Sequence, residues 1–277
     1  MAILAISRQV GAVDEHLIKR MAEQLGYTYI DRKMIRERME KNGYPSEKFN
    51  TYDEVKPHFF SFFSKDRENY VNYLTEAICC ECINADMKCV FAGRAAFHIL
   101  KDIPSRVSVR LVADAHTRLE RAKKEFGIDM KAAKKKLLRS EMDKYGYYKL
   151  YFKLKLSDES LFDLVLDTTG MAEEDVAQTV ISFLKKNVSE EDERVSKEKI
   201  NNLRLGQLIV SLLFNAYDVN VSNFTANVTG KTVTLGGITD TSGTIEYIKN
   251  ILACEMPSYE IVSNISAVQD SMSRSRR

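Results

Sequence analysis

The sequence predicts an α/β fold: a parallel sheet with helices on both faces, followed by a small α+β unit. Two patterns carry this prediction. Five short apolar runs alternate with segments of helical spacing over residues 1–186, and strands that alternate with helices form parallel sheets. After a polar stretch at 187–198, which we expect to be a linker, the order changes to helix, hairpin, helix and strand. This change indicates a second domain at 199–268.

The charge and hydropathy of the chain limit its class. Its 277 residues suit one large or two smaller domains, each with its own core. With 41 basic and 39 acidic residues, no overall field favours nucleic acid or a membrane surface. The chain leads directly into a strand without a signal peptide, and no apolar run is long enough to span a bilayer. We therefore expect a cytoplasmic protein with no membrane span and no nucleic-acid partner.

The cysteines do not form the pattern of a secreted disulfide framework. There are five, an odd number, and four of them lie between Cys79 and Cys89. Cys79 and Cys82 have C-x-x-C spacing, but they lie in a predicted continuous helix without the turn of a zinc knuckle. Packing of small apolar side chains in a buried helix is the favoured interpretation, so we expect no metal site.

The first stretch, 2–25, is predicted to be a strand, a turn and a helix. A strand that enters a helix through a glycine-containing turn is where α/β proteins hold phosphate, because the helix N-terminus offers unpaired amide groups. Here the turn has one glycine, Gly11, together with the β-branched Val13 and the carboxylates of Asp14 and Glu15. The G-x-x-x-x-G-K-[ST] pattern is absent, so spacing alone favours an ordinary turn in which Asp14 caps the helix.

The second predicted strand, 27–30, ends at Asp31 and Arg32. Because open α/β sheets place ligands at the carboxyl ends of strands, these residues are candidate substrate contacts. A helix cap and an exposed charge at the start of a helix at 34–41 are an equally good interpretation. The following loop, 42–66, carries four phenylalanines between Phe59 and Phe63 and is predicted to be a substrate-side flap or half of a dimer contact.

The next predicted strand, 88–92, follows a long helix that ends near Asp86 and is followed by Gly93, Arg94 and a helix at 95–102. The planar guanidinium of Arg94, directly after a strand, is well placed to meet a phosphate. A fourth strand, 106–113, leads into a helix with Asp114 as its expected cap. Arg118 and Arg121 lie one turn apart on that helix and share a face, although they could equally be surface residues.

The segment 130–155 is basic and rich in tyrosine, and it has three interpretations. It could be a nucleic-acid surface, a lid that brings cations over phosphates, or a solvated amphipathic helix. We favour the lid because a fifth strand at 162–167 and a helix at 172–185 then complete a parallel sheet covered on both faces.

Five segments together resemble one family. AISRQVG, YIDRKMI, FAGRAAFHIL, DKYGYYKLYF and LFDLVLDTTGM are similar, in this order, to segments of the cytidylate-kinase-like proteins, a branch of the P-loop nucleoside monophosphate kinases. The resemblance covers about residues 1–186 and implies a P-loop kinase-like sheet. It also implies ATP-dependent phosphoryl transfer to a pyrimidine nucleoside monophosphate, with magnesium.

The resemblance also implies site residues. Those on the catalytic side are Arg94, Arg121 and Arg139. Those of the nucleotide-binding loop are Arg8, Gly11, Ala12, Val13, Asp14, Glu15 and His16. Those on the substrate side are Asp31, Arg32, Arg94 and Arg118.

The chain departs from the family pattern at the loop and at the lid. The family's loop reads Gly-Ser-Gly-Gly-Arg-Glu, whereas this chain has Gly-Ala-Val-Asp-Glu-His at 11–16, and Tyr145-Gly146 replaces a lid arginine. A carboxylate beside the β- and γ-phosphates repels them by on the order of a few kcal/mol. We therefore expect weak or lost kinase activity, with nucleotide binding retained through Arg94 and the helix dipole. The alternative is a non-catalytic protein that senses a nucleotide or mediates assembly.

The C-terminal segments resemble the BON domain. A helix at 200–216, a hairpin that turns at Thr229-Gly230-Lys231, a helix at 241–254 and a strand at 259–268 form an α-β-β-α-β unit. The resemblance implies a small binding or assembly module, so a homo-oligomer could form through this unit or through the Phe-rich segment 59–63. The basic tail 269–277 is expected to be disordered.

Overall fold

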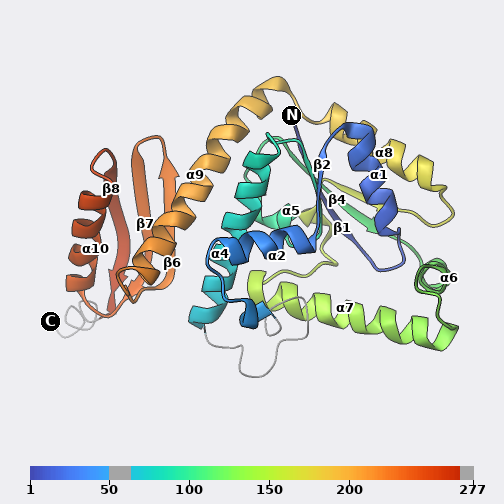
Figure 1. Ribbon diagram of the computed structural model, residues 1–277, viewed down its shortest axis with the longest axis horizontal. Coiled ribbons are helices and arrows are strands. Elements are labelled where there is room, and N and C mark those ends of the chain that lie inside the picture. Colours follow the sequence, from blue (N-terminus) through green and yellow to red (C-terminus); the bar gives the residue numbers. More distant parts are fainter. Residues whose placement is uncertain (50–63, 269–277) are drawn as a thin grey trace. The chain divides into compact units, whose positions relative to one another are not determined.

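The computed structural model describes residues 1–49 and 64–268 (Figure 1). The predictions for the Phe-rich segment 59–63 and for the tail 269–277 lie outside these residues. The chain divides into two compact units. The first unit comprises 1–49 and 80–197, and the second comprises 64–79 and 198–268.

The first unit contains a five-stranded sheet in which every neighbouring pair is parallel, as predicted. The strand order is β2-β3-β1-β4-β5. The strands are β1 (Ile3–Arg8), β2 (Thr28–Ile30), β3 (Cys89–Ala92), β4 (Arg106–Val112) and β5 (Leu164–Asp167). This order places β1 at the centre, so the loop that follows β1 lies between the carboxyl ends of β3 and β4.

Helices flank this sheet. They are α1 (Glu15–Leu25), α2 (Arg32–Lys41), α4 (Ser64–Asn84), α5 (Ala96–Ile99), α6 (Ala115–Phe126), α7 (Met130–Phe152) and α8 (Glu173–Lys186), with short 3₁₀ turns at Ser46–Lys48 and Glu159–Leu161. On one face, Leu17 of α1 and Val180 of α8 pack with Leu4 and Ile6 in one apolar cluster. This burial stabilises the unit at about 25 cal/mol per Å² of apolar surface removed from water.

Two predicted features of the first unit are confirmed and one is shorter than expected. The Asp14 carboxylate accepts a hydrogen bond from the backbone N–H of Leu17, and Asp114 caps α6 in the same way. The helix expected at 95–102 is limited to α5: it begins only at Ala96, because Arg94 and Ala95 have left-handed backbone angles (φ 58° and 57°), and residues 100–102 form a turn. Residues in this region of φ/ψ space do not continue a right-handed helix.

The clustered cysteines are packing residues of the first unit's interior and of α4. Cys79, Cys80, Cys82 and Cys89 are all buried. Within 1–49 and 64–268, no three His, Cys, Asp or Glu residues lie close enough together to hold a metal ion. None of the described helices is both long enough and apolar enough to cross a membrane.

The second unit has the predicted α-β-β-α-β order. It comprises the end of α9 (Glu190–Asn215), β6 (Ser222–Thr229), β7 (Thr232–Thr239), α10 (Ser242–Glu255) and β8 (Glu260–Ala267). The central strand β7 pairs antiparallel with β6 and parallel with β8. Ile248 and Leu252 of α10 pack with Val233 and Leu235 of β7 in the apolar core.

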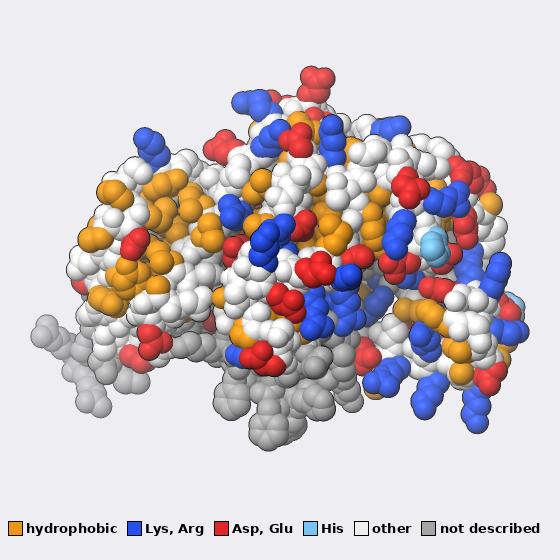
Figure 2. Space-filling view, in the orientation of Figure 1, with side chains coloured by type: hydrophobic (Ala, Val, Ile, Leu, Met, Phe, Trp, Pro, Cys, Tyr) orange, Lys and Arg blue, Asp and Glu red, His pale blue; other side chains and the backbone are white. Residues whose placement is uncertain are grey.

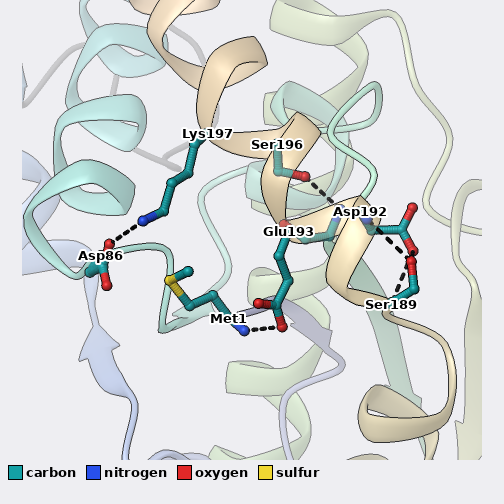
Figure 3. A network of polar contacts seen from close by, with 8 residues as sticks. Met1, Asp86, Ser189, Asp192, Glu193, Ser196 and Lys197 are labelled. Atoms are coloured by element: carbon teal, nitrogen blue, oxygen red, sulfur yellow. Dashed lines mark hydrogen bonds and ion pairs between the residues drawn. The ribbon is translucent and has the colours of Figure 1, made fainter.

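The structure differs from the prediction at 187–198, because the expected linker is helical from Glu190 onward. Ser189 and Asp192 form reciprocal bonds at the start of α9: the Ser189 N–H donates to Asp192 Oδ2 (2.9 Å) and the Asp192 N–H donates to Ser189 Oγ (3.2 Å). Further along, the buried Ser196 Oγ accepts the backbone N–H of Ser105 (Figure 3). The polar composition of this stretch therefore belongs to a capped helix start and not to a flexible linker.

Candidate functional site

A cavity of about 550 Å³ lies at the carboxyl ends of β1, β2 and β3. Side chains from the β1 loop, α1, α2 and α7 line it, and the basic ones outnumber the acidic ones. The charged lining residues are Arg8, Glu15, Asp31, Arg32, Lys33, Arg36 and Lys144. The position agrees with the general rule that open α/β sheets bind ligands at the carboxyl ends of their strands.

On the α2 side of this cavity, the sequence-predicted pair Asp31 and Arg32 is present. Asp31 also caps α2, since its Oδ1 accepts the Met34 N–H at 2.9 Å, so both interpretations of this residue hold together. Arg36 lies one turn beyond Arg32 and lines the same cavity, with its guanidinium carbon 4.5 Å from the ring centre of Phe49. The first turns of α2 therefore present two guanidinium groups to one space.

The loop that follows β1 is held through its carbonyl oxygens. Arg8 Nη1 donates to the Val13 carbonyl at 2.7 Å, and Arg118 Nε donates to the Val10 carbonyl at 2.9 Å. Lys144 Nζ donates to the Arg8 carbonyl at 2.8 Å. A phosphate-binding loop presents backbone N–H groups to its ligand, whereas here cationic side chains bind the opposite, acceptor side of the peptide groups.

Arg121 fixes the same loop to the segment after β5. Its Nη1 donates to the Ala12 carbonyl and to Thr168 Oγ1, and its Nη2 donates to the Thr168 carbonyl at 2.9 Å. The Thr168 hydroxyl in turn donates to the Ala12 carbonyl at 2.8 Å. Three segments that are distant in the sequence therefore meet at one peptide group.

The remaining loop residues are buried or serve as a helix cap. Ala12 and Val13 are 0% and 5% exposed and belong to the apolar core. Gly11 has a φ of 78°, and a Cβ there would collide with the carbonyl of Arg118. The Asp14 carboxylate lies at the N-terminus of α1, 2.9 Å from the Leu17 nitrogen. With a carboxylate and no cation at the N-terminus of α1, the residues present do not fit the triphosphate of ATP with its magnesium ion.

Glu15 and Tyr29 face each other on the wall of the cavity. The Tyr29 hydroxyl donates to Glu15 Oε1 at 3.0 Å. Burial, followed by this hydrogen bond, raises the pKa of Tyr29 well above its usual value. The phenol therefore remains a neutral donor, and the Glu15 carboxylate is held at the wall.

The other site residues that the family resemblance implied lie outside this cavity lining. Arg94 is buried at 5% exposure directly after Gly93, which itself lines the cavity. Arg118 pairs with Glu141 at 2.5 Å, and the side chain of Arg139 is 76% exposed and 3.7 Å from Asp143. Figure 2 shows Lys and Arg side chains gathered along α7, where Arg139 lies.

Sequence reasoning missed Arg36, Lys144 and Tyr148 as lining residues. Helical spacing could have indicated them, because Arg36 follows Arg32 by four residues and Tyr148 follows Lys144 by four. The Tyr148 hydroxyl accepts the buried N–H of Ala95 at 3.3 Å, which fixes α7 beside the start of α5.

Comparisons with known proteins identify the family of the chain. The family model described as the cytidylate kinase-like family matches residues 3–170. The cytidylate kinase of Thermoplasma volcanium is 26% identical over 181 residues, which are 65% of this chain and 89% of that protein. That of Pyrococcus abyssi is 26% identical over 63% of this chain and 88% of its own length. A solved structure of an uncharacterized protein from Eubacterium ventriosum is similar with a TM-score of 0.51 and 19% identity, covering 67% of this chain and 99% of that one.

Proposed function

Because the chain belongs to the cytidylate kinase-like family, we propose that its basic cavity binds a nucleoside monophosphate in the cytoplasm and that phosphoryl transfer from ATP is weak or lost. The parallel five-stranded sheet flanked by helices is that of P-loop kinases, and nucleoside monophosphate kinase activity is plausible on family grounds. The two parts of the proposal rest on different residues and can fail separately.

The charges of the cavity support binding of the monophosphate. Arg32 and Arg36 line one space at the strand ends, and guanidinium groups bind phosphate through two parallel N–H bonds. The carboxylates of Glu15 and Asp31 do not cancel this charge, because five basic side chains line the cavity against these two acidic ones.

One observation carries the second part of the proposal: the Asp14 carboxylate lies at the α1 N-terminus, where the phosphates of ATP would bind. Phosphoryl transfer is catalysed almost wholly by positioning and charge neutralisation. A carboxylate in place of a cation therefore removes the principal contribution that the loop makes to catalysis. Arg121 and Arg118 donate to loop carbonyls, so they are not aimed at phosphate in this arrangement.

Calorimetry and a turnover assay on the full chain test the two parts. We expect CMP to bind, ATP to bind much more weakly, and CDP formation from ATP, magnesium and CMP to be slow or absent. Arg32→Gln should weaken CMP binding by about tenfold or more, whereas Arg194→Gln, an exposed change of equal charge on α9, should not. No measurable CMP affinity would overturn the first part, and rapid CDP production would overturn the second.

The second unit supports a further candidate role, that of a BON-like assembly or sensing module at 199–268. The α-β-β-α-β order is that of the domain it resembles. Ile238 of β7 and Val262 of β8 are 46% and 37% exposed, and their strand positions place them on one face of the sheet. If this face mediates self-association, Ile238→Asp should convert an oligomer to a monomer in size-exclusion chromatography with light scattering. An unchanged mass would count against assembly through this face.

A further inference from the structure

A second cavity, of about 380 Å³, lies at the carboxyl ends of β4 and β5. It shares no lining residue with the cavity described above. Its polar lining residues include Gln9, Arg110, Asp114, Ser157, Glu159 and Asp167. Leu156, Phe162 and Val165 supply an apolar wall.

The inner end of this cavity is formed by a buried cation. Arg110 is 8% exposed, and its Nη1 donates to Ser7 Oγ at 2.6 Å. Within residues 1–49 and 64–268 no carboxylate lies at ion-pair distance from Arg110, and its guanidinium carbon is 5.9 Å from the ring centre of Phe162. Burial lowers the pKa of Arg110, which reflects the cost of a charge removed from water. A buried charge is stable when it is paired, so the inner end is suited to an anion.

The rim of the cavity has the opposite sign. Asp114 Oδ1 accepts the N–H of Thr117 at 2.9 Å, and Asp167 Oδ1 accepts the N–H of Thr169 at 2.9 Å, so both carboxylates are held in place. Glu159 adds a third carboxylate to the lining. A carboxylate has about four acceptor sites; Asp114 already accepts from the His116 N–H, the Thr117 N–H and the Thr117 hydroxyl, whereas Asp167 can accept further hydrogen bonds. A ligand that passes this rim therefore needs hydrogen-bond donors at its outer end.

We propose that this cavity binds a small carboxylate whose far end carries an ammonium or hydroxyl group. The ligand's carboxylate pairs with Arg110, its donor group meets Asp167 at the rim, and its carbon chain lies against Leu156 and Phe162. A singly charged carboxylate balances the single guanidinium, and the fork of Arg matches its two oxygens. Asp167 pairs in the sheet with Val112, two residues beyond Arg110, so the backbone positions of Arg110 and Asp167 are offset by roughly 7 Å along the strand. A chain of a few carbons spans such an offset.

Calorimetry on the full chain with three probes tests the proposal. We expect γ-aminobutyrate and γ-hydroxybutyrate to bind about tenfold or more tightly than butyrate, which lacks the donor group. Arg110→Gln should abolish binding of all three probes. Arg194→Gln removes the same charge from an exposed position and should leave their binding unchanged. If none of the probes binds, or if butyrate binds as tightly as the other two, the proposal is wrong.

A second variant keeps the proposal testable if Arg110→Gln does not fold. Asp167 is exposed and lies outside the first cavity. Asp167→Asn should remove the preference for γ-aminobutyrate over butyrate while the melting temperature and CMP binding stay unchanged. A preference that survives Asp167→Asn would overturn the assignment of the rim, and failure of CMP binding in the wild type would leave this cavity's test unaffected.

Discussion

At the scale of the residue, arginine side chains in the first unit bind carbonyl oxygens of the loop after β1. Arg118 and Arg121 of α6 reach back to the carbonyls of Val10 and Ala12, and Arg8 binds that of Val13. Hydrogen bonds that involve a charged donor contribute about 1.5–3 kcal/mol. The conformation of this loop is therefore fixed by cations that the family resemblance would direct at a nucleotide.

Replacement of Asp14 by serine separates its two roles. Serine caps a helix about as well as aspartate, so Asp14→Ser should change the free energy of unfolding by less than about 0.5 kcal/mol. Because the negative charge at the α1 N-terminus is removed, ATP affinity measured by calorimetry should rise severalfold. Asp14→Ala, which also loses the cap, should cost about 1 kcal/mol of stability. An unchanged ATP affinity in Asp14→Ser would show that the carboxylate does not exclude the triphosphate.

Replacement of Arg121 by glutamine tests the hold on the loop. The variant loses the bonds to Ala12 and Thr168, so we expect the free energy of unfolding in urea to fall by about 2 kcal/mol or more. Arg194→Gln, which removes an exposed i,i+3 pair, should change it by less than about 0.5 kcal/mol. Equal effects of the two changes would contradict a special role for Arg121.

At the scale of the element, aspartate caps set where the helices begin. Asp14, Asp31, Asp114 and Asp129 each accept a backbone N–H from the first turn of the helix that follows. Such bonds satisfy amide groups that have no partner inside the helix. Asp14, Asp31 and Asp114 follow β1, β2 and β4, so α1, α2 and α6 begin at the edge of the sheet where the cavities lie.

The cap of α6 predicts a dependence of stability on pH. The Thr117 hydroxyl and then the Thr117 N–H hold the pKa of Asp114 well below its usual value. Since the folded pKa lies below the unfolded pKa of about 3.9, Asp114 contributes stability above that pH, and this contribution is lost as pH falls toward the folded value. Asp114→Asn still caps the helix but does not titrate. In urea unfolding its stability should therefore fall less below about pH 4 than that of the wild type; parallel curves would contradict the prediction.

Two helical glycines in the second unit provide a matched pair. A Cβ on Gly206 of α9 would collide with the carbonyl of Ala226 in β6, which cannot move without disturbing the strand. Gly206→Ala should therefore cost about 1–3 kcal/mol in denaturant unfolding. Gly243 in α10 has its nearest neighbour, the Thr241 hydroxyl, at 3.7 Å from such a Cβ. Gly243→Ala should be neutral or stabilising, because alanine favours helix by about 1 kcal/mol, and a loss of stability there would contradict this reasoning.

At the scale of the whole molecule, α4 and α9 are each divided between the two units. The first turns of α9 belong to the first unit and are held by polar contacts (Figure 3). Lys197 pairs with Asp86 at 2.8 Å, Glu193 pairs with the terminal amine of Met1, and Ser196 accepts from Ser105 at 2.8 Å. The buried contact of Ser196 is expected to matter most, because Ser105 and Ser196 are both 0% exposed.

Removal of the Ser196 hydroxyl tests this attachment. Ser196→Ala leaves the buried Ser105 N–H without its acceptor, which costs about 1–3 kcal/mol. In differential scanning calorimetry we expect a lower melting temperature for the transition of the first unit. Lys197→Gln removes an exposed pair worth about 0–1 kcal/mol and should have a small effect. An unchanged scan for Ser196→Ala would contradict the role of this contact.

The sequence by itself determined the strands, their alternation with helices and the caps at Asp14, Asp31 and Asp114, because apolar period and capping act within a few residues of the chain. It did not determine that α9 begins at Glu190, since a polar capped helix start and a linker have the same composition. Only the tertiary structure decided which groups the arginine side chains face. Arg121 and Ala12 are 109 residues apart, so whether this guanidinium faces a ligand or a loop carbonyl depends on how α6 packs. Arg110 likewise lies within a regular strand, where the sequence shows only a charged residue. It forms the inner end of a cavity because β5 and the segment before it supply the other walls.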